Sequence, residues 1–170
     1  GYSDAFRSLE PFVKAVQHLK EKGSSVLSKL EMRFIGNNPR SIYDMVLNAY
    51  LEDIIKFRHG VDYYKSLELM QESDWLLHVD AFFPQLASGR SIFFAGKLAD
   101  YMGAGKPVFA LTGKGSVADQ IVTEMGGISV QPWEILSIAD KLEDILSGNV
   151  GYCLNTSYIA RYSAPAVAAT

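Results

Sequence analysis

Residues 94–111 read FAGKLADYMGAGKPVFAL, and this stretch contains both elements of an α/β unit. Residues 96–104 predict a short helix, and Gly105 suits the position after it, where the backbone often turns left-handed. Pro107 then opens an apolar run to Leu111, which is typical of a parallel strand buried on both faces. A helix and a strand follow each other through a short turn, so the stretch predicts a layered α/β fold.

The same alternation recurs on both sides of this stretch. Further helices are expected over residues 4–22, 41–51, 62–72, 116–125 and 132–147, and further strands over residues 30–35, 54–57, 75–79 and 128–130. Ser3 or Asp4 is expected to cap the first helix, Pro132 to lie just inside the last of these helices, and a short helix to form around residues 164–168. This order predicts a Rossmann-like three-layer sandwich with a parallel sheet.

The chain is expected to form a single domain over residues 1–170, with residues 149–170 as a loosely attached tail. A doubly wound sheet normally opens with a strand, and none precedes the first predicted helix. We therefore expect that the domain lacks its first strand.

The composition excludes several classes of protein. The 170 residues are 48% hydrophobic and 21% charged, which are values of a globular chain. The net charge is −3 without a basic run, so a nucleic-acid partner is not expected. One cysteine, Cys153, and three scattered histidines offer neither a disulfide framework nor metal-ligand spacing. No apolar stretch is long enough for a membrane span, so a cytoplasmic location is expected, with peripheral association at the inner membrane face left open.

The start of the helix at residue 96 carries the clearest candidate chemistry. Gly96 allows close approach of a ligand, and the free N–H groups of a helix start favour an anion such as phosphate. Lys97 adds a positive charge there, and Asp100 lies on the same face, where its carboxylate can accept hydrogen bonds from ribose hydroxyls. This pattern is compatible with a site for a diphosphate and its ribose. The spacing alone favours the simpler interpretation of a surface pair of opposite charges.

Residues 113–118, GKGSVA, match the Gly-x-Gly-x-x-Ala fingerprint of dinucleotide-binding domains. That fingerprint belongs after the first strand of its sheet and needs an acidic residue at the end of the next strand. Here it follows a late strand, and the next strand ends at Gln131 and Pro132. A dehydrogenase is therefore disfavoured, whereas a phosphate contact at this helix start remains reasonable.

The central stretch resembles the segment Lys-Leu-x-Glu-Tyr-x-x-x-Gly-Lys-Pro-Val of GT-B-type glycosyltransferases, close to the large retaining family called glycosyltransferase family four. Lys97, Leu98, Tyr101 and residues 105–108 stand at matching places. The likeness extends over residues 5–146. It implies the donor-binding, C-terminal half of a two-domain enzyme whose N-terminal, acceptor-binding domain is not in this sequence.

The resemblance also implies what the site binds. Its ligand would be a nucleotide-diphosphate sugar, transferred to an acceptor in polysaccharide or glycan synthesis, without a further cofactor or a metal. Asp100 would take the place of the ribose-binding glutamate, and Lys97 with the backbone of residues 96–98 would lie near the diphosphate. The remaining binding residues implied are Gly96, Leu98, His59, Gly60 and Val61, the last three near the base, with Ser116 and Val117 near phosphate or ribose. No catalytic residue is identified.

Two departures from the family pattern bear on function. The ribose-binding glutamate is shortened to Asp100, and the family's preceding glutamate falls at Ile92, where Ser91 or Arg90 could take over. The chain alone is expected to be inactive. Two alternatives remain: a sugar-nucleotide epimerase of the same architecture, and a non-catalytic nucleotide-binding or scaffold module.

Overall fold

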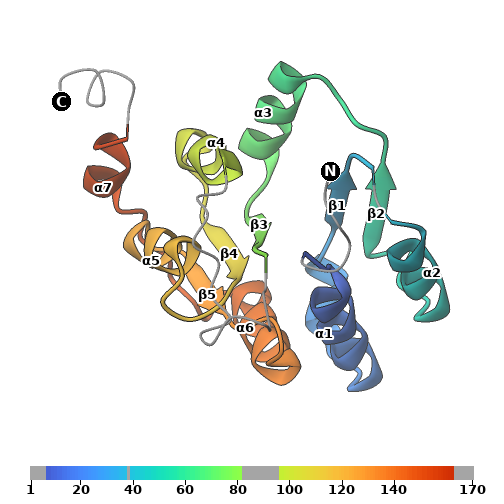
Figure 1. The fold of residues 1–170 in the computed structure, drawn as a ribbon. Helices are drawn as coiled ribbons and strands as arrows, with labels where there is room; N and C mark the ends of the chain where they lie inside the picture. The colour runs from blue at the N-terminus through green and yellow to red at the C-terminus, as the bar shows by residue number, and fades with distance from the viewer. Residues whose placement is uncertain (1–6, 38, 82–95, 163–170) are drawn as a thin grey trace. The chain divides into compact units, whose positions relative to one another are not determined.

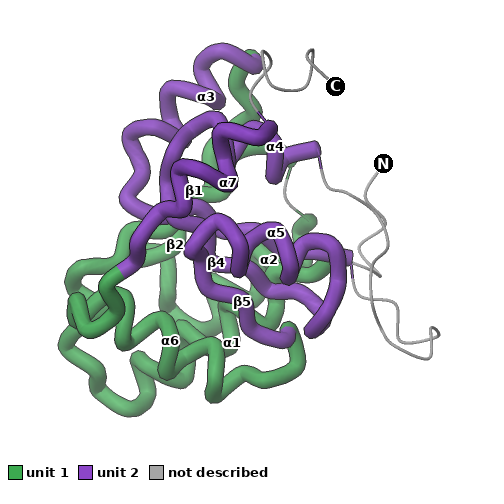
Figure 2. The backbone as a smooth tube through the Cα atoms, turned by 90° about the vertical axis from the view of Figure 1, so that its left-hand side faces the viewer, with its two compact units in different colours: residues 1–62, 132–151 green, residues 63–131, 152–170 purple. Residues whose placement is uncertain are grey.

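The computed structural model describes residues 7–37, 39–81 and 96–162 (Figure 1). The chain divides into two compact units (Figure 2). Unit 1 contains residues 1–62 and 132–151, and unit 2 contains residues 63–131 and 152–170.

Unit 1 is built around two parallel strands, β1 (Met32–Ile35) and β2 (Ile55–Arg58). Its helices are α1 (Glu10–Glu21), the 3-10 turn η1 (Ser25–Lys29), α2 (Arg40–Asn48) and α6 (Ile135–Ser147). Helix α1 packs against both α2 and α6, and its apolar stripe is completely buried, with Phe12 at 0% exposure. The ring of Phe12 meets Phe34 of β1 edge to face at 6.5 Å, so the helix is anchored on the strand pair.

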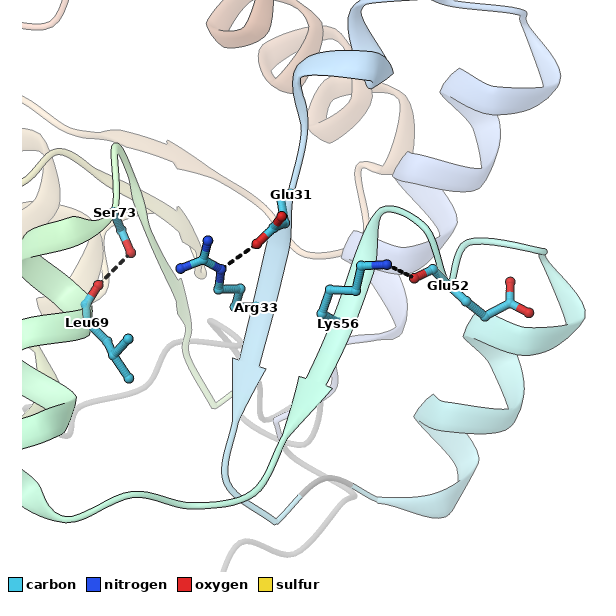
Figure 3. Close-up of polar contacts among 6 residues, drawn as sticks. All are labelled: Glu31, Arg33, Glu52, Lys56, Leu69 and Ser73. Atoms are coloured by element: carbon cyan, nitrogen blue, oxygen red, sulfur yellow. Dashed lines mark hydrogen bonds and ion pairs between the residues drawn. The ribbon is translucent and has the colours of Figure 1, made fainter.

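The polar contacts on these strands lie at the surface (Figure 3). Arg33 of β1 pairs with Glu31, and Lys56 of β2 donates to the carbonyl oxygen of Glu52 at 2.7 Å. The hydrogen bond from Arg33 lowers the pKa of Glu31. Exposed pairs of this kind contribute little to stability, so unit 1 is held mainly by its apolar core.

A polar cluster joins the end of α1 to α6. Lys22 contacts the carboxylate of Glu143 at 3.0 Å, and the hydroxyl of Ser24 donates to the same carboxylate. These two hydrogen bonds, that from Ser24 first, lower the pKa of Glu143. Because these hydrogen bonds form only in the folded chain, the carboxyl group of Glu143 ionises more readily in the folded state than in the unfolded state.

Replacing Glu143 with glutamine is expected to lower the melting temperature at neutral pH. A carboxyl whose pKa is lowered by folding adds stability above its unfolded pKa, and this stability is lost as the pH falls through the folded pKa. The deficit of Glu143→Gln should therefore shrink as the pH falls below the usual range of a glutamate. Melting curves from pH 3 to pH 7 measure it, with Glu72→Gln at an exposed site of α3 as the control. An equal deficit at both ends of the range would contradict the assignment.

Unit 2 contains a three-stranded parallel sheet in the order β3-β4-β5, formed by Leu76–Val79, Val108–Leu111 and Ile128–Val130. Its helices are α3 (Tyr63–Glu72), α4 (Gly96–Ala104), α5 (Val117–Glu124) and α7 (Thr156–Ala160). All residues of the central strand β4 are buried. Leu98, Val108, Val122 and Met125 are completely buried in one apolar cluster with residues of α3, α4 and α5.

The predicted α/β class with parallel strands is confirmed. The strands of the described residues form two small sheets, β1-β2 and β3-β4-β5. The expected first strand remains a prediction.

The starts of α1 and α6 differ from expectation. Helix α1 begins at Glu10, because Pro11 fits the first turn of a helix and the side chain of Ser8 accepts the N–H of Glu10 at 3.1 Å. The expected caps Ser3 and Asp4 lie outside the described residues. Helix α6 begins at Ile135, so the expectation that Pro132 lies inside it is wrong.

Helix α7 (Thr156–Ala160) was not predicted from the sequence. Helix α7 is capped by the side chain of Asn155, which accepts the N–H of Tyr158 at 3.0 Å. The helix expected around residues 164–168 lies outside the described residues. Tyr158 and Ile159 of α7 pack against the apolar cluster of unit 2.

Candidate functional site

Helix α4 is fixed on one face and open on the other. Leu98, Tyr101 and Met102 are buried at 0%, 9% and 4% exposure. The Tyr101 hydroxyl donates to the carbonyl oxygen of Leu77 in β3 at 3.1 Å. The opposite side presents Lys97, which is exposed, and Asp100, which is half-buried. The two predicted binding side chains therefore share a face whose backbone is held firmly by the core.

Asp100 is joined to a neighbouring helix. Tyr63, the first residue of α3, donates its hydroxyl to Oδ1 of Asp100 at 3.0 Å. This hydrogen bond and the negative charge of Asp100 raise the pKa of Tyr63. Tyr63 was not predicted as a site residue, because no local pattern links two residues that lie 37 positions apart. The structure thus adds a residue to the predicted pair.

The residues expected near the base lie in unit 1. His59, Gly60 and Val61 follow β2 and are exposed. A Cβ added at Gly60 would lie 3.8 Å from the Cα atom of Gly36, an ordinary van der Waals contact. The other predicted binding residues belong to unit 2. The two groups therefore belong to different units, and the role of residues 59–61 remains a prediction.

The start of α5 is closed by its own side chains. Ser116 caps the helix as predicted, and its hydroxyl accepts the N–H of Asp119 at 3.0 Å. A carboxylate oxygen of Asp119 also accepts the N–H of Gly115, the residue before the cap, at 2.5 Å. Ser116 is 1% exposed, and Val117 packs against the apolar cluster. Their contact with phosphate or ribose remains a prediction, and the hydroxyl of Ser116 is already engaged in the fold.

A buried polar chain continues inward from this cap. The oxygen atoms of Ser116 and Thr112 lie 2.7 Å apart, and the Thr112 hydroxyl donates to Oδ2 of Asp80 at 2.9 Å. The other oxygen of Asp80 accepts the N–H of Ala81 at 2.8 Å. Asp80, Thr112 and Ser116 are at most 3% exposed. The chain joins the residues that directly follow β3 and β4 to the first turn of α5.

The remaining expectations concern Leu98, residues 90–92, a metal site and a membrane span. The side chain of Leu98 is completely buried, so this residue can meet a ligand only through its backbone. Ile92, Ser91 and Arg90 lie outside the described residues. Within the part of the chain that the structure describes, no group of three or more acidic, histidine or cysteine side chains could hold a metal ion. Among the described helices, none has the length and apolar character needed to cross a bilayer.

No protein-family model matches the sequence, and no curated protein matches it significantly. Solved structures do match. The apo form of WaaB, a lipopolysaccharide outer core galactosyltransferase, superposes with a TM-score of 0.68 at 14% identity, over 97% of this chain and 44% of that one. Anabaena HepE in complex with UDP gives 0.62 at 16% identity, over 96% and 41%. WaaG, a glycosyltransferase involved in lipopolysaccharide biosynthesis, gives 0.61 at 18% identity, over 98% and 41%.

These matches identify the class of fold. The matched proteins are GT-B-type glycosyltransferases, and the chain has the fold of a Rossmann-like half of such a protein. At these identities the likeness is one of fold. The chain spans less than half the length of the solved structures that it matches.

Proposed function

We propose that the chain is the donor-binding part of a glycosyltransferase that moves a sugar from a nucleotide-diphosphate sugar to an acceptor. The observation that carries the proposal is the face of α4 that presents Lys97 and Asp100 on a helix whose other face is buried in the core. The fold shared with GT-B glycosyltransferases supports the same reading. So do the solved structures of Anabaena HepE in complex with UDP and with UDP-glucose.

Lys97 and Asp100 would contact different parts of the donor. The ammonium group of Lys97 offers a positive charge to the diphosphate, and during transfer it would stabilise the charge that develops on the leaving group. The carboxylate of Asp100 would accept hydrogen bonds from the ribose hydroxyls. Hydrogen bonds to a charged acceptor are stronger than those to a neutral one. The backbone at Gly96 and Leu98 lies in the first turn of the same helix, where N–H groups favour an anion.

The acceptor and the chemical step belong to the rest of the proposed enzyme. An N-terminal domain would hold the acceptor, and residues 59–61 would lie near the base. We propose that the transfer needs no metal. The product would be a polysaccharide or glycan, made at the cytoplasmic side of the inner membrane. Lipopolysaccharide enzymes among the similar structures support this class of product.

Calorimetric titration of the chain with UDP, GDP and ADP in the presence of EDTA tests the donor site. We expect one of the three to bind, and we expect Asp100→Ala to raise its Kd by about tenfold or more, because the lost hydrogen bonds are to a charged group. Lys97→Ala should raise the Kd by a similar or smaller factor. Exposed residues outside the site, replaced in Asp74→Ala and Lys65→Ala, serve as matched controls.

If the folded chain binds none of the three nucleotides at millimolar concentration, the donor site is not formed by this chain, and a non-catalytic scaffold becomes the better reading. Equal effects of the site variants and the control variants would show that the loss of binding comes from general damage.

A further inference from the structure

The hydrogen bond between Tyr63 and Asp100 lies at the proposed donor site. It joins the first residue of α3 to the exposed side of α4, and the oxygen atoms lie 3.0 Å apart. Tyr63 is 58% exposed, so the bond adds little to the stability of the fold. Its clearest consequence is local: it holds the carboxylate of Asp100 in one orientation on the face that also carries Lys97.

An aromatic surface lies next to this hydrogen bond. The ring of Tyr64 meets that of Tyr63 at a centroid distance of 5.9 Å, and Tyr64 is 78% exposed. Two large rings are therefore left in water beside a carboxylate. Rings offer a face for stacking, and a carboxylate accepts hydroxyl groups, so the combination suits a ligand with a flat apolar group attached to a diol.

We propose that Tyr63 is a further nucleoside-binding residue, which stacks its ring against the base and orients Asp100 toward the ribose hydroxyls. The assignment rests on the donor site proposed above and adds to it a side chain that would contact both the base and Asp100. One side chain can contact both parts of a nucleoside, because the ribose carries the base and the two hydroxyl groups on neighbouring ring carbons.

The hydrogen-bonding capacity of Asp100 is sufficient for this arrangement. A carboxylate has about four lone-pair sites, and the hydroxyl of Tyr63 uses one of those on Oδ1. The remaining sites can accept both ribose hydroxyls while Tyr63 stays in place. The raised pKa of Tyr63 keeps its hydroxyl protonated, and so a donor, at any ordinary assay pH.

Two substitutions distinguish the contribution of the Tyr63 hydroxyl to binding from that of its ring. Tyr63→Phe removes only the hydroxyl, so it should raise the Kd of the ribonucleoside diphosphate by about fivefold and leave that of its 2′,3′-dideoxy analogue unchanged. Tyr63→Ala also removes the ring and should raise the Kd of both ligands by about fivefold or more. Tyr64→Phe is the matched control and should change neither. Circular dichroism and melting curves should be the same for all variants.

The outcomes separate the two proposals. If Asp100→Ala weakens nucleotide binding but both Tyr63 variants bind like the wild type, the assignment of Tyr63 fails and the donor site stands. If Tyr63→Phe weakens the ribonucleotide and the dideoxynucleotide equally, the hydroxyl does not act through the ribose, and the assignment fails as stated. If the folded wild-type chain binds no nucleotide, both proposals fail together.

Discussion

Replacing Gly127 with alanine is expected to lower the free energy of unfolding by about 3 kcal/mol, the upper part of the usual range for forcing an extra methyl group into a packed core. A Cβ at this position would lie 2.5 Å from the carbonyl oxygen of Val108 and 2.9 Å from a methyl carbon of Val122. Val108 is backbone of the central, fully buried strand β4, so the neighbour cannot move aside cheaply. Urea denaturation followed by circular dichroism measures the loss.

Gly103 provides the matched control. It lies inside α4, and a Cβ there would meet nothing within 4 Å. Gly103→Ala should therefore raise stability by about 0.5–1 kcal/mol, because alanine is the better helix former. If Gly127→Ala were as stable as the wild type, the close approach of residue 127 to β4 would be wrong.

Replacing Asp80 with alanine is expected to cost about 3 kcal/mol. Its carboxylate accepts one bond from the N–H of Ala81 and one from the hydroxyl of Thr112. Because Thr112 gives its only hydroxyl proton to Asp80, Ser116 must donate to Thr112 and can then accept the N–H of Asp119. Removing Asp80 leaves buried donors without an acceptor and disrupts the chain that ends at the start of α5.

A double-mutant cycle tests whether the loss is specific to this chain. Thr112→Val removes the donor that Asp80→Ala would leave unpaired, so the double variant should be less destabilised than the sum of the single variants by about 1 kcal/mol or more. Asp44→Ala, which breaks an exposed pair with Arg40, should cost less than about 1 kcal/mol. Strict additivity in the cycle would show that Asp80 and Thr112 do not act together.

Elements marked by strong local signals were predicted well. Gly105 ends α4 with a φ of +64°, and β4 starts directly after Pro107, as the central stretch indicated. Ser116 caps α5 through its side chain. Each of these signals acts within a few residues, because glycine permits a left-handed backbone, proline removes a donor and serine supplies an acceptor.

Signals that compete locally were harder to interpret. Pro132 suited a helix start, but the helix begins three residues later, at Ile135. Asn155 caps α7, but α7 is only five residues long and has no buried stripe of its own, so no periodic pattern marked it. Its place depends on contacts of Tyr158 and Ile159 with the apolar cluster, and such contacts are absent from any local window.

The sequence by itself determined the α/β class, the parallel strands and the face of α4 that carries Lys97 and Asp100. Those features follow from periodicity and capping, which operate over one or two turns of chain. Only the tertiary structure decided that Tyr63 reaches Asp100, that Asp80, Thr112 and Ser116 form one buried chain, and that Gly127 lies against β4. Each of the last three joins side chains or backbone from separate elements. Their energies depend on distances that exist only after those elements have packed together.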